Sequence, residues 1–358
     1  MKLDDLTDLI VGLTASPLAD FKSHSLGAQY ERDLTADPDL TRKAHQKSRQ
    51  SLFGKECSSD PAEMIVTRCM SNAKAARRKQ RLELTEAGIH GCPDHAANAA
   101  RLRRDMDGIE YARVAKHVYL KYDENTPDDL KAPPPGFFAA TPEDLDEIGL
   151  RQSMLTPDNT NFRAAVYKKD PAVWGENESK KFVVVGRGST TAREDWENNM
   201  AQNANKESSY YERAVAIGNA ISDAGASDKV HLAGHSLAGG LMAAAQGGSG
   251  ATATTFNSAS LNPRTVARYS TLPSRQQAEP NKILAYQVEG EVLSATQETG
   301  LTSLFTRPAL GKRIVVPPSS QAVSKADRHS MDEVIKGIEA QKSADESAIH
   351  NCLNSTQR

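Results

Sequence analysis

The sequence lacks the long apolar run that a membrane-spanning helix requires. No stretch reaches the roughly 18 to 20 consecutive apolar residues needed to cross a bilayer, which argues against helical membrane spans. A strong excess of charge is also missing, because the formal net charge is -2 at pH 7, and this argues against a surface built to bind nucleic acid. Asp4, Asp5 and Asp8 stand where a signal peptide needs basic and then apolar residues, so we predict no cleavable signal.

Cysteine is scarce. The four cysteines are Cys57, Cys69, Cys92 and Cys352. The first three lie near His90 and His95, but the spacing matches no standard zinc pattern, and we expect neither a metal nor an organic cofactor. A disulfide among those three cysteines is favoured in an oxidising compartment, and the sequence leaves the pairing open.

With 358 residues, 38% of them hydrophobic, the chain can form one enzymatic domain of about 200 to 250 residues and an accessory segment. As far as Tyr122 the pattern is helical and polar, and Leu102, Met106 and Ile109 are spaced for one face of a helix. The basic run 74–81 is typical of a solvated helix face, with nucleic-acid contact as the weaker alternative.

From Asn161 onward, strand patterns alternate with helix patterns. Residues 162–168 and 181–185 are separated by turn formers and predict a hairpin. Further strands are expected at 229–233, 252–256, 282–288 and 313–316, and helices at 210–221, from Leu237, and at 330–340. This alternation predicts an α/β fold with a mostly parallel sheet flanked by helices.

One serine is expected at a sharp turn between a strand and a helix. In Gly234-His235-Ser236-Leu237-Ala238, Ser236 follows a strand, and small residues flank it as a strained nucleophile turn requires. Ser249 stands in a similar glycine-rich pattern but follows a helix, so we interpret it as a loop residue. A helix-capping role for Ser236 is the structural alternative.

A serine nucleophile of this class needs a histidine base and a carboxylate that follow it in the chain. His329 precedes the final amphipathic helix, whereas His350 lies in a polar tail, so His329 is the predicted base. The acid should lie on the turn after a strand, which favours Glu291 over Glu289. The other candidates are Glu279, Glu298 and Asp327, with Asp327 held in reserve.

The strand at 182–185 continues into Gly186-Arg187-Gly188-Ser189-Thr190, and Asp195-Trp196 comes next. Together with Gly-His-Ser-Leu-Ala-Gly-Gly at 234–240, this order resembles the class 3 lipases, which are α/β-hydrolases, and more narrowly the bacterial lipase-like phospholipase effectors. The resemblance implies that Ser189 and the backbone amide of Leu237 form the oxyanion hole; the alternative for Ser189 is an ordinary turn serine.

This chain departs from the family pattern at three positions. Gly186 replaces phenylalanine, Ala238 replaces glycine and Glu291 replaces aspartate. The first exchange is expected to open space near the oxyanion loop. Residues 301–310, with Leu304 and Phe305, are interpreted either as a lid that contacts lipid or as core packing.

These observations predict a helical accessory region at 1–104, an α/β-hydrolase domain at 105–345 and a polar C-terminal tail at 346–358. The predicted function is hydrolysis of lipid carboxylic esters. The resemblance implies an A-type phospholipase that is secreted or delivered as an effector toxin and acts at membranes, such as those facing the periplasm. Its expected partners are a phospholipid substrate, the membrane surface and a secretion-system component or immunity protein, but no nucleic acid. A triglyceride lipase, a thioesterase and a non-catalytic binding protein are the alternatives.

Overall fold

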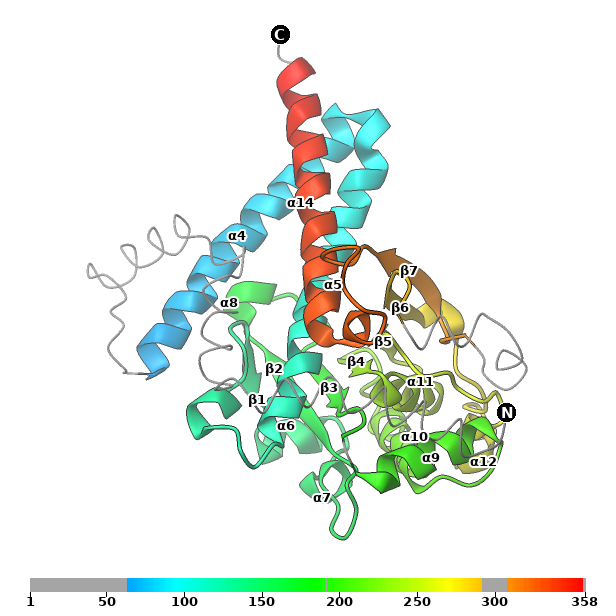
Figure 1. The fold of residues 1–358 in the computed structure, drawn as a ribbon. Helices are drawn as coiled ribbons and strands as arrows, with labels where there is room; N and C mark the ends of the chain where they lie inside the picture. Colours follow the sequence, from blue (N-terminus) through cyan, green and yellow to red (C-terminus); the bar gives the residue numbers. More distant parts are fainter. Residues whose placement is uncertain (1–62, 191, 292–307, 357–358) are drawn as a thin grey trace.

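The computed structural model describes residues 63–190, 192–291 and 308–356 (Figure 1). Its centre is one seven-stranded sheet whose strands are adjacent in chain order. The first three strands pair antiparallel and the rest are parallel. The strands are β1 (Phe137–Ala139), β2 (Ala164–Lys169), β3 (Phe182–Gly186), β4 (Val230–His235), β5 (Thr252–Phe256), β6 (Ile283–Val288) and β7 (Lys312–Val316). The predicted α/β class and the predicted 162–168/181–185 hairpin are therefore confirmed, whereas the short edge strand β1 was not predicted.

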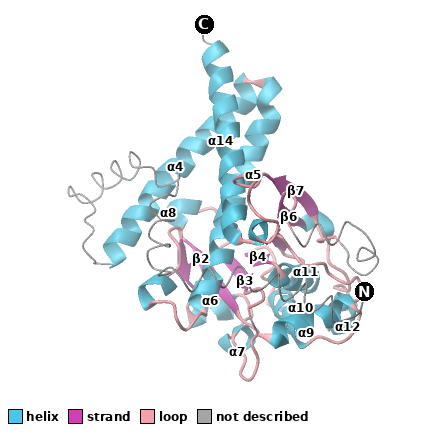
Figure 2. Cartoon of the chain, in the orientation of Figure 1, coloured by secondary structure: helices cyan, strands magenta, loops and turns pink. Residues whose placement is uncertain are grey.

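Helices cover both faces of the sheet, as Figure 2 shows. Each right-handed crossover to the next parallel strand places its helix on the same face, so the connecting helices share one side. That side carries α10 (Ser209–Asp223), α11 (Leu237–Ser249) and the short α12 (Thr265–Tyr269). The opposite face is left for helices from the two ends of the described chain, α5 (Ala96–Lys121) and α14 (Met331–Thr356).

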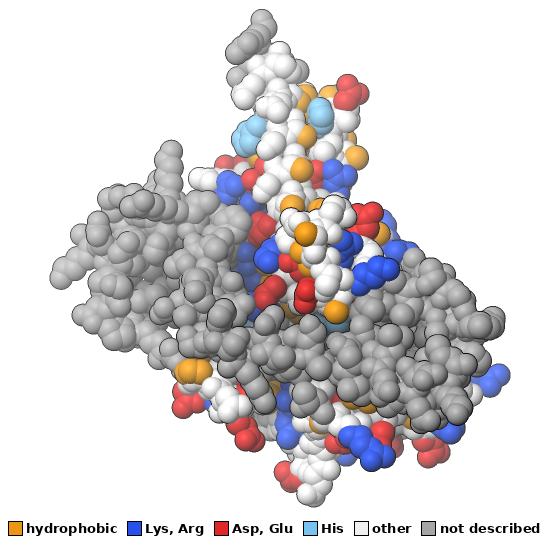
Figure 3. All heavy atoms as spheres, in the orientation of Figure 1, with side chains coloured by type: hydrophobic (Ala, Val, Ile, Leu, Met, Phe, Trp, Pro, Cys, Tyr) orange, Lys and Arg blue, Asp and Glu red, His pale blue; other side chains and the backbone are white. Residues whose placement is uncertain are grey.

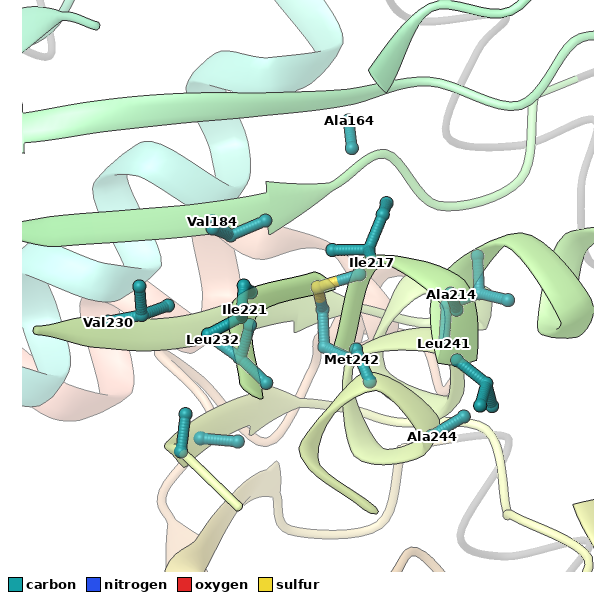
Figure 4. Close-up of a cluster of buried hydrophobic side chains, with 14 of the residues drawn as sticks. Ala164, Val184, Ala214, Ile217, Ile221, Val230, Leu232, Leu241, Met242 and Ala244 are labelled. Carbon is teal, nitrogen blue, oxygen red and sulfur yellow. The ribbon is translucent and has the colours of Figure 1, made fainter. Parts of the chain in front are cut away.

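Side chains on the central strands alternate between two cores. On β3, Phe182 and Val184 belong to the core under α10 and α11, and Val183 and Val185 belong to the core under α5 and α14. Figure 4 shows the first core, in which Val184 lies near Ile217 and Met242. Phe182 and the three valines of β3 are all buried, which explains why this strand is a continuous apolar run in the sequence.

Short helices fill the connections between these elements. They are α6 (Pro142–Glu147), α7 (Gln152–Leu155), α8 (Pro171–Trp174) and α9 (Arg193–Asn203). Among the described helices we find none that combines the length and the apolar character needed to cross a membrane.

A three-helix bundle rises from the sheet, formed by α4 (Glu63–Gly91), α5 and α14 (Figure 1). A disulfide joins Cys92, between α4 and α5, to Cys352 near the end of α14. Of the three pairings expected among Cys57, Cys69 and Cys92, the two that involve Cys92 are therefore wrong, and the third concerns side chains outside the described residues. Folding brings together two cysteines that are 260 residues apart, which local spacing does not reveal.

Two further expectations for this bundle are corrected. The final helix does not stop at Ala340, and the tail predicted over 346–358 is helical as far as Thr356, because Ile349 packs into the bundle core with Leu102. The basic run 74–81 is a solvated face only in part, because Lys79 is exposed and its two end residues are not. Lys74 and Arg81 are buried, where they pair with Glu110 and Glu346.

The expected boundary between residues 104 and 105 falls inside α5. The helix is continuous across it, and its second half packs on the sheet through residues such as Val114 and Val118. Where the accessory region begins and ends remains a prediction.

Candidate active site

Ser236 occupies a strained turn between β4 and α11. Its backbone has φ 57° and ψ −126°, a conformation that a non-glycine residue adopts only when its surroundings enforce it. The Ser236 amide donates to the Phe256 carbonyl (3.0 Å), and the Ser236 carbonyl accepts from the Ala259 amide (2.9 Å). Gly234 is required beneath the turn, because a Cβ there would lie 2.3 Å from the Ala238 carbonyl oxygen.

In the structure His329 lies next to this serine, and Glu291 lies next to His329. His329 Nε2 lies 2.9 Å from Ser236 Oγ, and His329 Nδ1 lies 2.8 Å from Glu291 Oε2. The carboxylate can only accept from Nδ1–H, which leaves Nε2 free to accept the serine proton. The three residues thus form a continuous hydrogen-bonded chain from a buried carboxylate to a hydroxyl.

Glu291 and His329 each lie at or just after the end of a strand or helix. Glu291 follows β6 after a turn at Gly290, whose φ is +70°, and its side chain is fully buried. His329 ends a short 3-10 helix, Asp327–His329, directly before α14. The carboxyl ends of the parallel strands β4 and β6 lie at the same edge of the sheet, so these loops converge there.

The other candidates lie elsewhere. His350 and Glu289 are exposed, and the carboxylate of the exposed Asp327 accepts from Ser324 Oγ. Glu279 pairs with Arg275 and Lys282. Glu298 lies outside the described residues, as does the 301–307 part of the predicted lid with Leu304 and Phe305. Ser249 is buried and is the last residue of α11, so the expectation that it lies in a loop is wrong.

His235 supports the His329 loop, a role that sequence reasoning missed. Its Nε2 lies 2.7 Å from the His329 carbonyl oxygen, and its Nδ1 lies 2.9 Å from Tyr119 Oη on α5. Burial, reinforced by the neighbouring His329 ring, lowers the pKa of His235 to about 3. His235 is therefore neutral, with Nε2–H donating to the carbonyl and Nδ1 accepting from the tyrosine. The sequence signal that could have revealed this role is the position of His235 directly before Ser236.

The loop after β3 lies against the turn that carries Ser236. A Cβ on Gly188 would come within 2.6 Å of the His235 carbonyl oxygen, so the backbone that leads to Ser189 passes beside Ser236. Ser189 is half-buried on this loop. Leu237 is the first residue of α11, and the first amides of a helix have no intrahelical acceptor. Both predicted oxyanion groups are thus carried by segments that adjoin the turn.

Asp195 on α9 fixes the shape of that loop. Its buried carboxylate accepts from the backbone amide of Thr190 (2.7 Å) and from the Thr190 hydroxyl (2.9 Å). Asn161 and Tyr210 also donate to it. Burial, together with the nearby carboxylate, raises the pKa of Tyr210, so its hydroxyl remains a donor.

The exchange at Gly186 does not open space, contrary to expectation. A Cβ on Gly186 would lie 3.1 Å from both the Ala238 Cβ and the Met242 Cε, which occupy the volume beside it. The Ala238 methyl group and the end of the Met242 side chain therefore lie where a side chain at residue 186 would begin.

Within the described residues, no group of three or more His, Cys, Asp or Glu side chains could hold a metal ion. The cluster around Ser236 consists of proton donors and acceptors joined by hydrogen bonds. Such a set suits attack of a hydroxyl on a carbonyl group.

Comparison with known proteins gives two findings. The family model described as "Phospholipase-like: Tle-like phospholipase domain" matches residues 110–315, more than half of the chain. The chain is also 29% identical over 221 residues to a protein of Serratia liquefaciens named "Extracellular phospholipase A1". That match covers 58% of this chain and 65% of the relative, slightly less than two thirds of the relative's length.

Proposed function

Since the chain belongs to the family of Tle-like phospholipase domains, we propose that it is a serine esterase that cleaves a fatty acyl ester of a phospholipid. The observation that carries the proposal is the chain of two hydrogen bonds that links Glu291, His329 and Ser236. The relative named as a phospholipase A1 supports the phospholipid substrate and the A-type cleavage.

In the proposed reaction His329 Nε2 takes the proton of Ser236 as Oγ attacks the ester carbonyl. Glu291 keeps Nδ1 protonated and stabilises the charged ring. The oxyanion accepts from the Leu237 amide and from the loop that carries Ser189, and each such donor is typically worth about 3 to 4 kcal/mol. His329 then protonates the departing lysophospholipid, and water releases the fatty acid from Ser236.

The proposal includes the framework in which this chemistry acts. The sheet and its strained serine turn are compatible with an α/β-hydrolase like the class 3 lipases. We place the catalytic domain at residues 105–345, with an N-terminal accessory region and a role as a secreted bacterial effector at a membrane surface. The relative's printed name, extracellular, supports secretion.

The test is lipid hydrolysis by the purified chain. Vesicles of phospholipids with different acyl chains at the two glycerol positions should release one fatty acid and the matching lysophospholipid, identified by mass spectrometry. Ser236→Ala should lower the rate by at least about 10⁴-fold while retaining its circular dichroism spectrum. Undiminished turnover by Ser236→Ala would refute the proposal.

Ser249→Ala is the matched control, since Ser249 stands in a similar glycine-rich pattern at the far end of α11. It should hydrolyse lipid at the wild-type rate. Parallel assays with a triglyceride and a thioester separate the phospholipase from the other acyl hydrolases that use the same residues.

A further inference from the structure

Asn257 lies where the segments that carry the nucleophile, the acid and the base meet. It directly follows β5, it is buried, and its φ is +40°. Its neighbours in the chain hold the nucleophile turn, because the Phe256 carbonyl and the Ala259 amide bond to the backbone of Ser236. The position of Asn257 is therefore fixed relative to Ser236 by the main chain.

The Asn257 side chain reaches the other two segments. Its Oδ1 accepts from the Val288 amide (2.9 Å), at the end of the strand that leads to the acid, and the Val288 carbonyl accepts from the Glu291 amide (3.2 Å). Its Nδ2 donates to the carbonyl oxygens of Arg328 and His329, each at 3.0 Å. One amide group thus joins the acid turn to the base loop.

The contact at the His329 carbonyl has a chemical consequence. The direction of an imidazole ring depends on its own backbone, and here that backbone ends a short 3-10 helix rather than lying inside a long helix. His235 Nε2 donates to the same oxygen as Asn257. The carbonyl is therefore fixed by two donors from two different strand ends, which limits rotation of the base about the loop.

We propose that Asn257 is a positioning residue that sets the alignment of His329 between Glu291 and Ser236. The inference rests on the proposed function of these three residues as an acyl-transfer site. Only a carboxamide meets both demands in one short side chain, because it accepts at one atom and donates twice at another. Asparagine also tolerates a positive φ better than most residues.

Asn257→Asp is the sharpest perturbation. The shape is kept, but the two donated bonds are lost and a carboxylate oxygen faces two carbonyl oxygens. Asn257→Gly is the second variant, because glycine accepts the positive φ and removes the amide without adding charge. The matched control is Asn262→Asp, since the Asn262 Oδ1 only accepts, from the Arg264 amide, and an aspartate keeps that bond.

The measurements are the labelling rate of Ser236 by a fluorophosphonate, and kcat and KM on phospholipid vesicles for the folded fraction. A misplacement of the base by about 1 Å corresponds to a loss of about 100-fold. We expect a loss of that size in labelling rate and kcat for both Asn257 variants, with KM within about twofold of the wild type. Asn262→Asp should match the wild type in all three quantities.

The inference is overturned if both Asn257 variants label Ser236 at the wild-type rate, or if their loss appears in KM and folded fraction alone. A purely structural role would produce the second pattern. Failure of the proposed function is recognised separately, because wild-type Ser236 would then not react with the fluorophosphonate at all.

Discussion

The disulfide between Cys92 and Cys352 should stabilise the chain strongly without serving the active site. It closes a loop between residues that are 260 positions apart, and in the chain-entropy account a loop of this length contributes about 5 kcal/mol. The contribution acts on the unfolded chain, in which the bond holds residues 92 and 352 together. Replacing both cysteines in Cys92→Ser/Cys352→Ser removes it. With a urea dependence of about 3 kcal/mol per molar, the unfolding midpoint should fall by roughly 1.7 M.

The activity of that double variant should survive in the absence of urea. His329 is held by bonds to His235 and Asn257 at the sheet, and the end of α14 is still fixed by ion pairs of Asp345 and Glu346 with arginines of α4 and α5. Urea unfolding followed by fluorescence gives the midpoint, and fluorophosphonate labelling of Ser236 gives the activity. A midpoint within about 0.3 M of the wild type, or a folded variant that fails to label, would contradict this reasoning.

Two further predictions concern the sheet and the bundle. Gly234→Ala should lower the free energy of unfolding by more than about 3 kcal/mol and abolish labelling of Ser236, because the new Cβ would meet the Ala238 backbone. Gly225→Ala is the control, since Gly225 has φ +64° but open space around it. It should cost about 1 kcal/mol and leave labelling unchanged. Burial opposes ionisation of Glu110, but Arg113 and Lys74 outweigh it and lower its pKa to about 2 from 4.5. Its stabilisation, about 3 kcal/mol, is therefore complete above pH 4.5 and is lost as the pH falls through about 2. In urea titrations, the deficit of Glu110→Gln should shrink from pH 5 to pH 3; a deficit independent of pH would count against the assignment.

The sheet was predictable because its signals are local. Buried strands such as 182–186 and 252–256 are apolar or β-branched runs bounded by turn formers. The strained turn was equally visible, since Gly234 and Ala238 flank Ser236 in the chain. The proximity of Glu291 and His329 followed from chain order and from the shared edge of a parallel sheet.

Contacts between distant segments could not be predicted in the same way. The buried partner of Lys74 is Glu110, and that of Arg81 is Glu346, so the sequence shows only a basic run in which each residue looks solvated. Cys92 likewise had nearer candidates than Cys352. In each case the deciding partner lies on another helix of the bundle, and only the packing of α4, α5 and α14 reveals it.

Two of the three departures from the class 3 lipase pattern, Gly186 and Ala238, become understandable as one coupled change. Taken alone, Gly186 suggests a wider oxyanion loop. Ala238, taken alone, suggests only one added methyl group beside the Ser236 turn. Their side-chain positions face each other, because a Cβ on Gly186 would lie 3.1 Å from the Ala238 Cβ. A bulky residue at 186 therefore requires the smaller glycine at 238, and a methyl group at 238 favours glycine at 186. The two exchanges are therefore coupled where their side chains begin, and Ala238 and Met242 occupy the space directly beside Gly186.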